Sequence, residues 1–544
     1  MYICLINKFD TMKRLLSLLA PVAAALVLLT VSCKNDKAPT ANSAEMDAFL
    51  REAPYLNHLP DEAEVLLSFH PLQLLDKSGF ATDEEFAPLR DQILGDMDVS
   101  TKIAALAALK DPSLAGLDPA HPLVVAITDI EVEREDVKAA ICGVLPLTNR
   151  ELFVTLLNKA DAGLTPEEDG NYRINDKDFS LAILPEAVLF YGQLNRDLGR
   201  SAVAAKMDAM IAKKSLYVGS HLAESVLMGG DDLALLASDK TADLYVQILN
   251  QNLGTDVVKL LGGNPLENLN SLLRLNCRRG ELLAEAIVEG SNPLYKRYSG
   301  WLGTPDKADL EWLPSFVAVA GQLALQNVPD LLDYAQEVLD RSGEADGVVL
   351  ADVIKAVGIE KKDLNEVGTI TFGYLYNDGR SDDFLVVAKA GEKIASTLDG
   401  MLDQLGTDRD PDTGFMHVSG NLCVTFKEDY AILATGGMIS RSTGSFTEDN
   451  PSLAHLLKGN SVVADLALGF HLPYVNHAVL TIDIPTATLE VVTAEPDENA
   501  AKTLLKALVD YLESNVFAAS DFDEAAFYYP EFDEDFDAEF DYLY

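Results

Sequence analysis

The sequence has few basic residues for its size, and this shortage excludes one class of partner. Only 42 Lys and Arg residues stand against 86 Asp and Glu residues, which gives a formal net charge of −44. Because nucleic-acid binding requires a basic surface, this charge argues against nucleic-acid partners. It favours high solubility and cationic partners.

Cysteine is also scarce, and no C-x-x-C pair occurs, so zinc and thioredoxin-type motifs are absent. Cys142, Cys277 and Cys423 are far apart and flanked by apolar residues. Buried free thiols are the simplest interpretation, and one disulfide with one remaining thiol stays open.

Catalytic motifs are missing as well. The eight histidines form neither HxH nor HExxH, and the sequence contains no G-x-S-x-G elbow, P-loop or dinucleotide fingerprint. A triad assembled from distant positions leaves no such signal. The sequence therefore names no catalytic residue.

The clearest positive signal is an apolar segment that ends at one cysteine. A Lys-Arg pair precedes the apolar run 15–31, and Cys33 follows it. This pattern predicts a lipoprotein signal peptide over 1–32, with Met12 as the natural start and Cys33 as the lipid attachment site. A transmembrane span needs ~20 uninterrupted apolar residues, more than this run supplies. The small polar residues of 33–51 suit a flexible tether.

The body of the chain contains a duplication. Segments 141–192 and 385–436 align with Gly170 opposite Gly414. Both segments predict a strand, a helix with apolar residues at helical spacing, and then a hairpin. Repeated supersecondary units of this kind indicate two related modules.

Two further segments, 271–290 and 478–495, each predict a long β-hairpin downstream of the repeat. We therefore expect an α+β fold with two tandem related modules of antiparallel sheet and packed helices. The modules cover 52–305 and 306–518, and an acidic aromatic tail, 519–544, follows them.

Several segments resemble a Bacteroidetes lipoprotein family of unknown function (domain of unknown function 4836): the leader ending in Ser32-Cys33-Lys34, YLNHLPDEAEVLLSFHPLQLLDKSG, GLDPAHPLVVAI and EEDGNYRIN. The resemblance covers nearly all of the chain after the leader except the tail, and its motifs are architectural. It implies an outer-membrane lipoprotein that faces the periplasm or the cell surface. It supplies no site residues.

An acidic loop is the one candidate metal site. Asp408, Asp410 and Asp412 place oxygen ligands at alternate positions, as Ca²⁺ requires. In an EF-type loop, however, Gly is sixth and Glu twelfth, whereas here Gly414 is seventh and Ser419 twelfth. A solvated turn is the alternative.

Arg274, Arg278 and Arg279 form the strongest basic cluster, and Gly280 places it at a hairpin turn. An anion site is one interpretation. A solvated turn and pairing with acidic neighbours within the chain are the alternatives.

The C-terminal tail is the most unusual segment. Between Asp521 and Tyr544, ten residues are acidic, nine are aromatic and none is basic. Crowded carboxylates oppose helix formation, so we expect a tail that is disordered when free and that orders on a basic or apolar partner. The alternatives are a tail with no binding role and a tail that packs back on the body. Aromatic residues at every fourth position would line one helical face and supply the anchors: Tyr528, Phe532, Phe536, Phe540 and Tyr544.

These observations favour a lipid-anchored, non-enzymatic binding or scaffold protein of the cell envelope. The membrane is one partner through the lipid, and a protein bound by the tail is another. Two alternatives stay open, namely an envelope hydrolase with a non-sequential site and a carrier of an apolar ligand between the modules. No cofactor is expected apart from the weak calcium signal.

Overall fold

The computed structural model describes residues 42–512, apart from several internal gaps. The leader 1–32, Cys33 and the tail 519–544 all lie outside the described residues. The gaps comprise 62, 96–98, 134–135, 160–162, 197, 315–316, 344–348, 376–382, 405–407, 442–458 and 466–473.

The strands of the first module pair in the order β4-β5-β6-β7-β3-β2-β1-β8-β9-β10, and every pair is antiparallel. Their bounds are β1 (Val65–Phe69), β2 (Leu123–Glu133), β3 (Asp136–Pro146), β4 (Thr165–Pro166), β5 (Tyr172–Asn175), β6 (Phe179–Ile183), β7 (Ala187–Leu194), β8 (Leu233–Ala237), β9 (Leu269–Arg278) and β10 (Glu281–Gly290).

The second module repeats this order from β5 onward as β14-β15-β16-β13-β12-β11-β17-β18-β19, again antiparallel throughout. The fold is therefore α+β with two related modules. Its strands are β11 (Val319–Ala324), β12 (Thr369–Leu375), β13 (Asp383–Lys389), β14 (Met416–Ser419), β15 (Leu422–Lys427), β16 (Tyr430–Thr435), β17 (Asn460–Asp465), β18 (Val475–Asp483) and β19 (Thr486–Thr493).

Local features of the repeat agree with this correspondence. Gly170 and Gly414 both have positive φ, at 81° and 76°, in the loops before β5 and β14. Only glycine adopts that conformation without steric cost. Gly116 and Gly358, which precede β2 and β12, also share a positive φ, at 73° and 84°.

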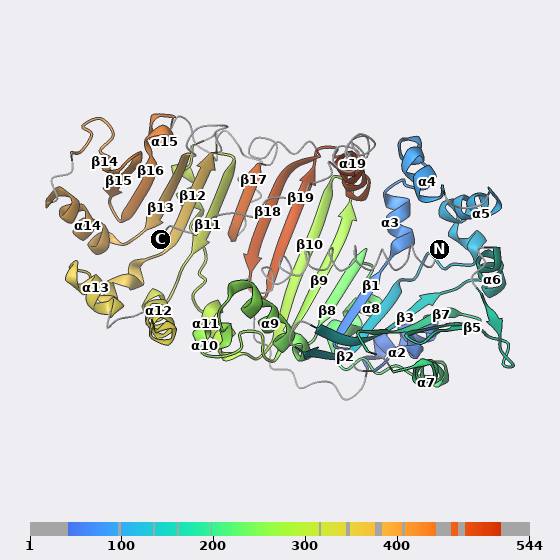
Figure 1. Cartoon of the computed structure of the whole chain (residues 1–544). Coiled ribbons are helices and arrows are strands. Elements are labelled where there is room, and N and C mark those ends of the chain that lie inside the picture. The colour runs from blue at the N-terminus through green and yellow to red at the C-terminus, as the bar shows by residue number, and fades with distance from the viewer. Residues whose placement is uncertain are drawn as a thin grey trace, which may run out of the picture.

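The two modules join edge to edge in one continuous sheet, because β10 pairs antiparallel with β19 (Figure 1). These two strands are equivalent: each follows a two-residue hairpin turn, Arg279-Gly280 in one module and Ile484-Pro485 in the other. Ala284 and Leu489, each fourth after its turn, lie directly opposite each other. An approximate two-fold axis through this pair therefore relates the modules.

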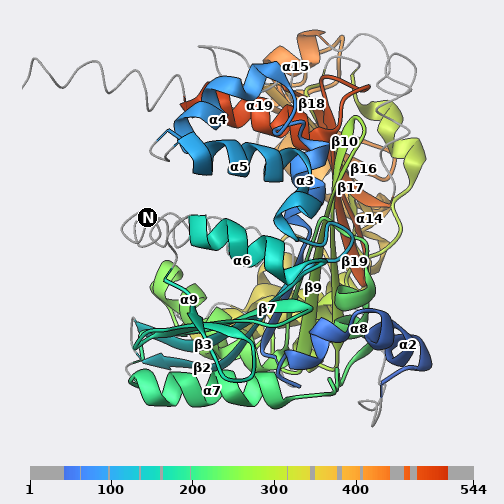
Figure 2. The ribbon, with the colours of Figure 1, turned by 90° about the vertical axis from the view of Figure 1, so that its right-hand side faces the viewer.

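Helices cover the sheet unevenly. Figure 2 shows α2 and α8 on one side of the central strands and α4, α5, α6 and α19 on the other. The helices are α2 (Ala44–Glu52), α3 (Pro71–Lys77), α4 (Ala87–Ile93), α5 (Val99–Lys110), α6 (Arg150–Lys159), α7 (Arg200–Ala212), α8 (His221–Met228), α9 (Ala242–Leu253), α10 (Val257–Leu261), α11 (Pro293–Ser299), α12 (Val328–Ser342), α13 (Leu350–Ala356), α14 (Glu392–Gln404), α15 (Gly436–Arg441) and α19 (Ala500–Leu512).

Local sequence sets where several helices begin. The side chains of Ser43, Ser220, Asp256 and Asn292 accept hydrogen bonds from backbone N–H groups in the first turns of α2, α8, α10 and α11. Such N-caps satisfy donors that have no partner within the helix.

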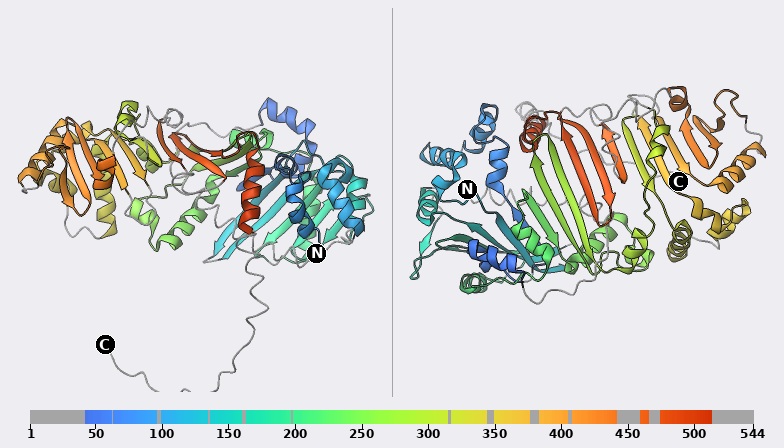
Figure 3. Two further views of the ribbon diagram at one scale, coloured as in Figure 1. Left: turned by 90° about the horizontal axis from the view of Figure 1, so that it is seen from above. Right: turned by 180° about the vertical axis from the view of Figure 1, so that it is seen from behind.

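Each module has a main core on the same face of the sheet. In the first module, α2, α7 and α8 pack over Leu66, Ala126, Leu236 and Leu272. In the second, the 3-10 helix Lys307–Trp312 and α15 supply the residues that pack over Val463 and Val479. Figure 3 shows from behind that the central strands lie between these two helical groups.

The opposite face is covered at its two ends. There, α6 packs over Leu145 and Leu181 in the first module, and α14 packs over Ala431 in the second. Among the described helices, none combines the length and apolar character that crossing a bilayer requires.

Candidate functional site

The central strands β9, β10, β19 and β18 carry different chemistry on their two faces. Side chains alternate along a strand, so the register assigns each residue to a face. One face, continuous with the two main cores, is largely polar. It carries Arg274, Asn276, Glu285, Thr481, Thr488 and Glu490.

The opposite face at the centre is apolar. One row runs straight across six neighbouring strands, and no member of it is charged or polar: Leu233, Leu275, Ala284, Leu489, Leu480 and Val462. The rows on either side add Leu273, Leu282, Ile482 and Val491. We call these ten residues the central apolar face.

All ten residues of the central apolar face are half-buried, whereas Ala286, Ala487 and Cys277 on the same side of the strands are buried, as are Leu236 and Leu272 under the helices of the opposite face. Exposed apolar area costs about 25 cal/mol per Å² relative to burial. A contiguous apolar patch of this kind marks a binding surface more often than scattered exposed leucines do.

The polar face explains the basic cluster seen in the sequence. The Arg274 side chain lies 3.4 Å from Asp231 and 3.5 Å from Glu285, and it donates to Ser225 Oγ at 2.8 Å. Arg278 pairs with Glu281 at 3.1 Å across the β9–β10 turn. The interpretation of pairing within the chain therefore fits these two arginines.

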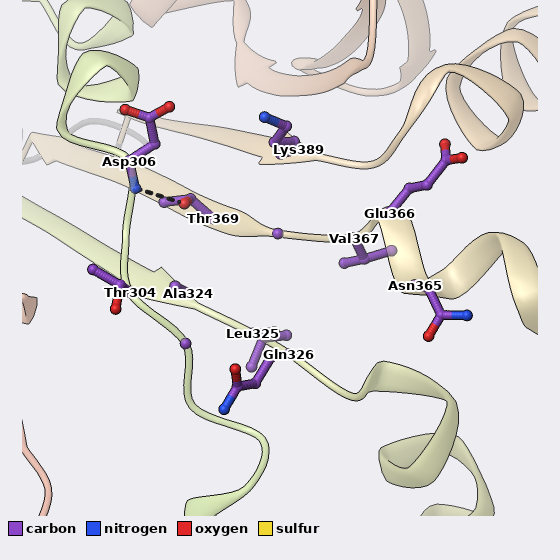
Figure 4. A pocket seen from close by; sticks show the side chains of 12 residues that line it. Thr304, Asp306, Ala324, Leu325, Gln326, Asn365, Glu366, Val367, Thr369 and Lys389 are labelled. Carbon is purple, nitrogen blue, oxygen red and sulfur yellow. Dashed lines mark hydrogen bonds between the residues drawn. The ribbon is translucent and has the colours of Figure 1, made fainter.

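Two cavities lie elsewhere, at the start of the second module. The first has a volume of about 360 Å³ and is lined by Thr304, Asp306, Gln326, Glu366 and Lys389, among others (Figure 4). Asp306 N donates to Thr369 Oγ1 at 2.9 Å beside it. The lining contains no His, Ser or Cys, and Thr369 Oγ1 is already engaged as the acceptor for Asp306 N.

The second cavity, of about 350 Å³, adjoins the first through Asn365. Its charged groups are occupied by one another: Arg297 donates to Asp330 at 2.9 and 3.0 Å and to Glu337 at 3.1 Å. The hydrogen bond to Asp330 raises the pKa of Arg297 above its ordinary value. Trp301 Nε1 also donates to Asp330, at 2.8 Å. These hydrogen bonds connect α11 and the residues after it to α12, which indicates a structural role for the charged groups.

Two buried carboxyl groups have unusual surroundings. Asp232 is fully buried and accepts hydrogen bonds from Lys77 Nζ at 2.6 Å and from Cys277 N at 2.7 Å. Asp309 accepts from the Tyr430 hydroxyl at 2.7 Å, while its other oxygen has no partner. Burial raises the pKa of Asp309 above its ordinary value.

The acidic loop forms a turn that its own residues complete. Asp410 accepts hydrogen bonds from the N–H groups of Asp412 and Thr413 and from the Thr413 hydroxyl, at 2.8 to 3.0 Å. Asp408 is exposed. Within the described residues, no group of three or more His, Cys, Asp or Glu side chains is arranged to hold a metal ion.

The three internal cysteines, Cys142, Cys277 and Cys423, are free and buried. The lipid attachment site Cys33 and the tail residues Tyr528, Phe532, Phe536, Phe540 and Tyr544 lie outside the described residues.

Comparison with known proteins adds little. No family model matches the chain, and no curated protein sequence matches it. Crystal forms IV and III of TP0453 align with 43% and 46% of this chain and with 79% and 89% of their own chains. Their sequence identities are 13% and 14%, and the TM-scores are 0.26 and 0.27. At these TM-scores the alignments support no argument about function.

Sequence reasoning missed the central apolar face. The signal was present, because β9 and β10 read LNSLLRLNCR and ELLAEAIVEG, with apolar residues on one side and charged residues on the other. Strand alternation of this kind predicts a sheet with one solvated face and one face covered by other parts of the protein. Only the structure shows that the two hairpins lie side by side and that their apolar sides form one surface.

Proposed function

We propose that this protein is a lipid-anchored, non-enzymatic binding protein of the cell envelope that uses the central apolar face as its binding surface. The observation that carries the proposal is the uncharged row from Leu233 to Val462, which crosses the junction of the modules. The leader and Cys33 support attachment through lipid. The resemblance noted above supports an outer-membrane location, on the periplasmic side or on the cell surface.

Binding fits this surface better than catalysis does. The face has apolar side chains and no ionised group in its central row, so it favours an apolar partner and offers nothing that moves a proton. The two cavities at the start of the second module contain no His, Ser or Cys in their linings. A hydrolase gains no support from these parts of the chain.

A photo-cross-linking amino acid placed on each face of the sheet tests the proposal in native membranes. Positions 275 and 480 lie on the central apolar face, and their neighbours 276 and 481 lie on the polar face of the same strands. We expect reproducible adducts with one partner at 275 and 480 and none above background at 276 and 481. Equal adducts on both faces would contradict the proposal.

The anchor is tested separately. Cys33→Ala should abolish incorporation of labelled fatty acid and release the protein from the membrane fraction. Protease treatment of intact and permeabilised cells then distinguishes surface exposure from a periplasmic location.

A carrier of an apolar ligand is a second candidate, favoured by the same uncharged row. Neither of the two cavities at the start of the second module is the enclosed apolar space that a carrier needs, so in this candidate the ligand lies on the central apolar face. Copurified lipid, detected by native mass spectrometry and lost in Leu275→Asp but not in Asn276→Asp, would support this candidate.

A further inference from the structure

One helix, α19, projects from the sheet on the side of the central apolar face, at the end of the strands where β9 turns into β10 (Figure 1). Figure 2 shows α19 on the opposite side of β9 and β10 from α2 and α8, which cover the other face. Asn499, next to the start of α19, donates from Nδ2 to Cys277 O at 3.2 Å. Lys502 pairs with Asp83 at 2.7 Å and with Glu85 at 2.9 Å, which ties α19 to the segment before α4.

This helix covers only one corner of the surface. The residues of the row from Leu275 to Leu480 remain half-buried although α19 contacts β9 and β10. The chain continues directly from the end of α19, Leu512, into residues 513–544. The helix starts at β9 and points away from the strands (Figure 2), so the segment that leaves its end starts on the side of the sheet that carries the central apolar face.

The chemistry of that segment fits the surface. Nine aromatic residues between Asp521 and Tyr544 supply apolar area, and five of them recur every fourth residue. Ten acidic residues separate them, so one side of the segment can face solvent. Exposed Arg279 stands at the β9–β10 turn, where an acidic segment meets opposite charge.

The length is sufficient. Residues 513–544 extend to roughly 110 Å at most. The four strands from β9 to β18 lie at a spacing of about 4.8 Å, so they are crossed within roughly 20 Å.

We propose that the C-terminal segment 513–544 folds back onto the central apolar face of its own chain and covers it until a partner displaces it. Aromatic side chains from the set Tyr528, Phe532, Phe536, Phe540 and Tyr544 pack on the leucines of the central row, and the carboxylates face water. The inference goes beyond the proposed function, because it names what occupies the surface in the free protein.

Intramolecular cross-linking in the purified mature protein, without membranes or partners, tests this. The same photo-cross-linker is placed at 275 and 480, with 276 and 481 as controls on the polar face. A mixture of isotopically heavy and light protein separates cross-links within one chain from cross-links between copies. We expect cross-links from 275 and 480 to peptides of 521–544 in the same chain, and none above background from 276 and 481.

A full-length variant with the five recurring aromatic residues changed to serine keeps all ten acidic residues. This variant should lose the cross-links from 275 and 480 and bind more of the dye ANS. A control variant with five of the acidic residues changed to serine should keep these cross-links at high salt, where charge contributes little. Heavy–light cross-links would assign the face to a second copy and overturn the proposal. Adducts with copurified lipid in place of the tail, or the absence of any tail cross-link, would also overturn it. The proposed function would survive these results, because it is judged from adducts formed in native membranes.

Discussion

Ala284 and Leu489 lie opposite each other in β10 and β19, each four residues beyond the turn of its own hairpin. The pairing on either side is symmetric, from Glu281 opposite Val492 to Ile287 opposite Thr486. Equivalent strands therefore form the junction, and the backbone hydrogen bonds of one ladder hold the two modules in a single sheet.

The junction makes a first prediction. In Ala284→Pro, β10 loses one N–H donor, and an acceptor in a neighbouring strand is left without its partner. We expect a loss of about 1–3 kcal/mol in the free energy of unfolding, measured by denaturant titration. Ala284→Val is the matched control, because it keeps the donor and suits a strand. Equal stability of the two variants would show that the ladder does not contribute as inferred.

The buried ion pair of the first module makes a second prediction. Lys77→Met leaves the fully buried carboxylate of Asp232 without its cation. We expect a loss of roughly 3–5 kcal/mol in unfolding free energy, and partial recovery when Asp232→Asn is added. The exposed pair of Lys362 with Glu360 provides the control, since Lys362→Met should change stability by less than about 0.5 kcal/mol. Similar effects at the two lysines would contradict the buried position of Asp232.

The unpartnered oxygen of Asp309 makes a pH-dependent prediction. At pH values below the ordinary aspartate pKa, the Asp309 carboxyl is protonated in both the folded and the unfolded chain. Burial raises its folded pKa, so as the pH rises through the interval between the two values the unfolded chain releases its proton first, and stability falls. Asp309→Asn keeps an acceptor for the Tyr430 hydroxyl and removes the titration. Its melting temperature should exceed that of the wild type at neutral pH and match it in acid, and a constant difference across pH would refute the assignment.

The acidic loop makes a fourth prediction. Hydrogen bonds from the backbone and hydroxyl of Thr413 lower the pKa of Asp410, so its carboxylate is already engaged in the turn. We expect Asp410→Ala to lower the melting temperature and millimolar CaCl₂ to leave that of the wild type unchanged. A calcium-dependent rise in the wild type that disappears in Asp408→Ala and Asp412→Ala would establish the calcium site instead.

The internal thiols make a fifth prediction. Burial raises the pKa of Cys142 to about 12 and that of Cys277 to about 11, and it also raises that of Cys423. Because the thiolate is the reactive form, none of the three should react with DTNB in the native protein at pH 8. All three should react in denaturant under non-reducing conditions. Fewer than three would indicate a disulfide.

Part of this fold was predictable because its signals are local. The duplication was visible from Gly170 and Gly414, which are both required by loops of positive φ, and the hairpins 271–290 and 478–495 were visible from turns between apolar strands. Such signals are set by neighbours in the chain. They define the fold class correctly. The expectation that 33–51 form a flexible tether is wrong for its last part, because α2 (Ala44–Glu52) packs Met46 and Leu50 into the first core.

The joining of the modules was not predictable in the same way. A strand edge carries no residue pattern that names its partner, because backbone groups make the pairing. The central apolar face depends on that pairing, since neither hairpin alone makes a row from Leu275 to Leu480. The central apolar face could therefore not be predicted, because the two hairpins that form it are far apart in the sequence.

The symmetric pairing of β10 with β19 has an evolutionary consequence. A strand edge that pairs with its own equivalent about a two-fold axis is the isologous contact of a homodimer. A single-module ancestor with this edge would close into such a dimer, and tandem duplication would then make the association covalent and independent of concentration. Once joined, the two halves were free to diverge, so a lineage could retain the shared surface at the axis while each half changed its outer helices.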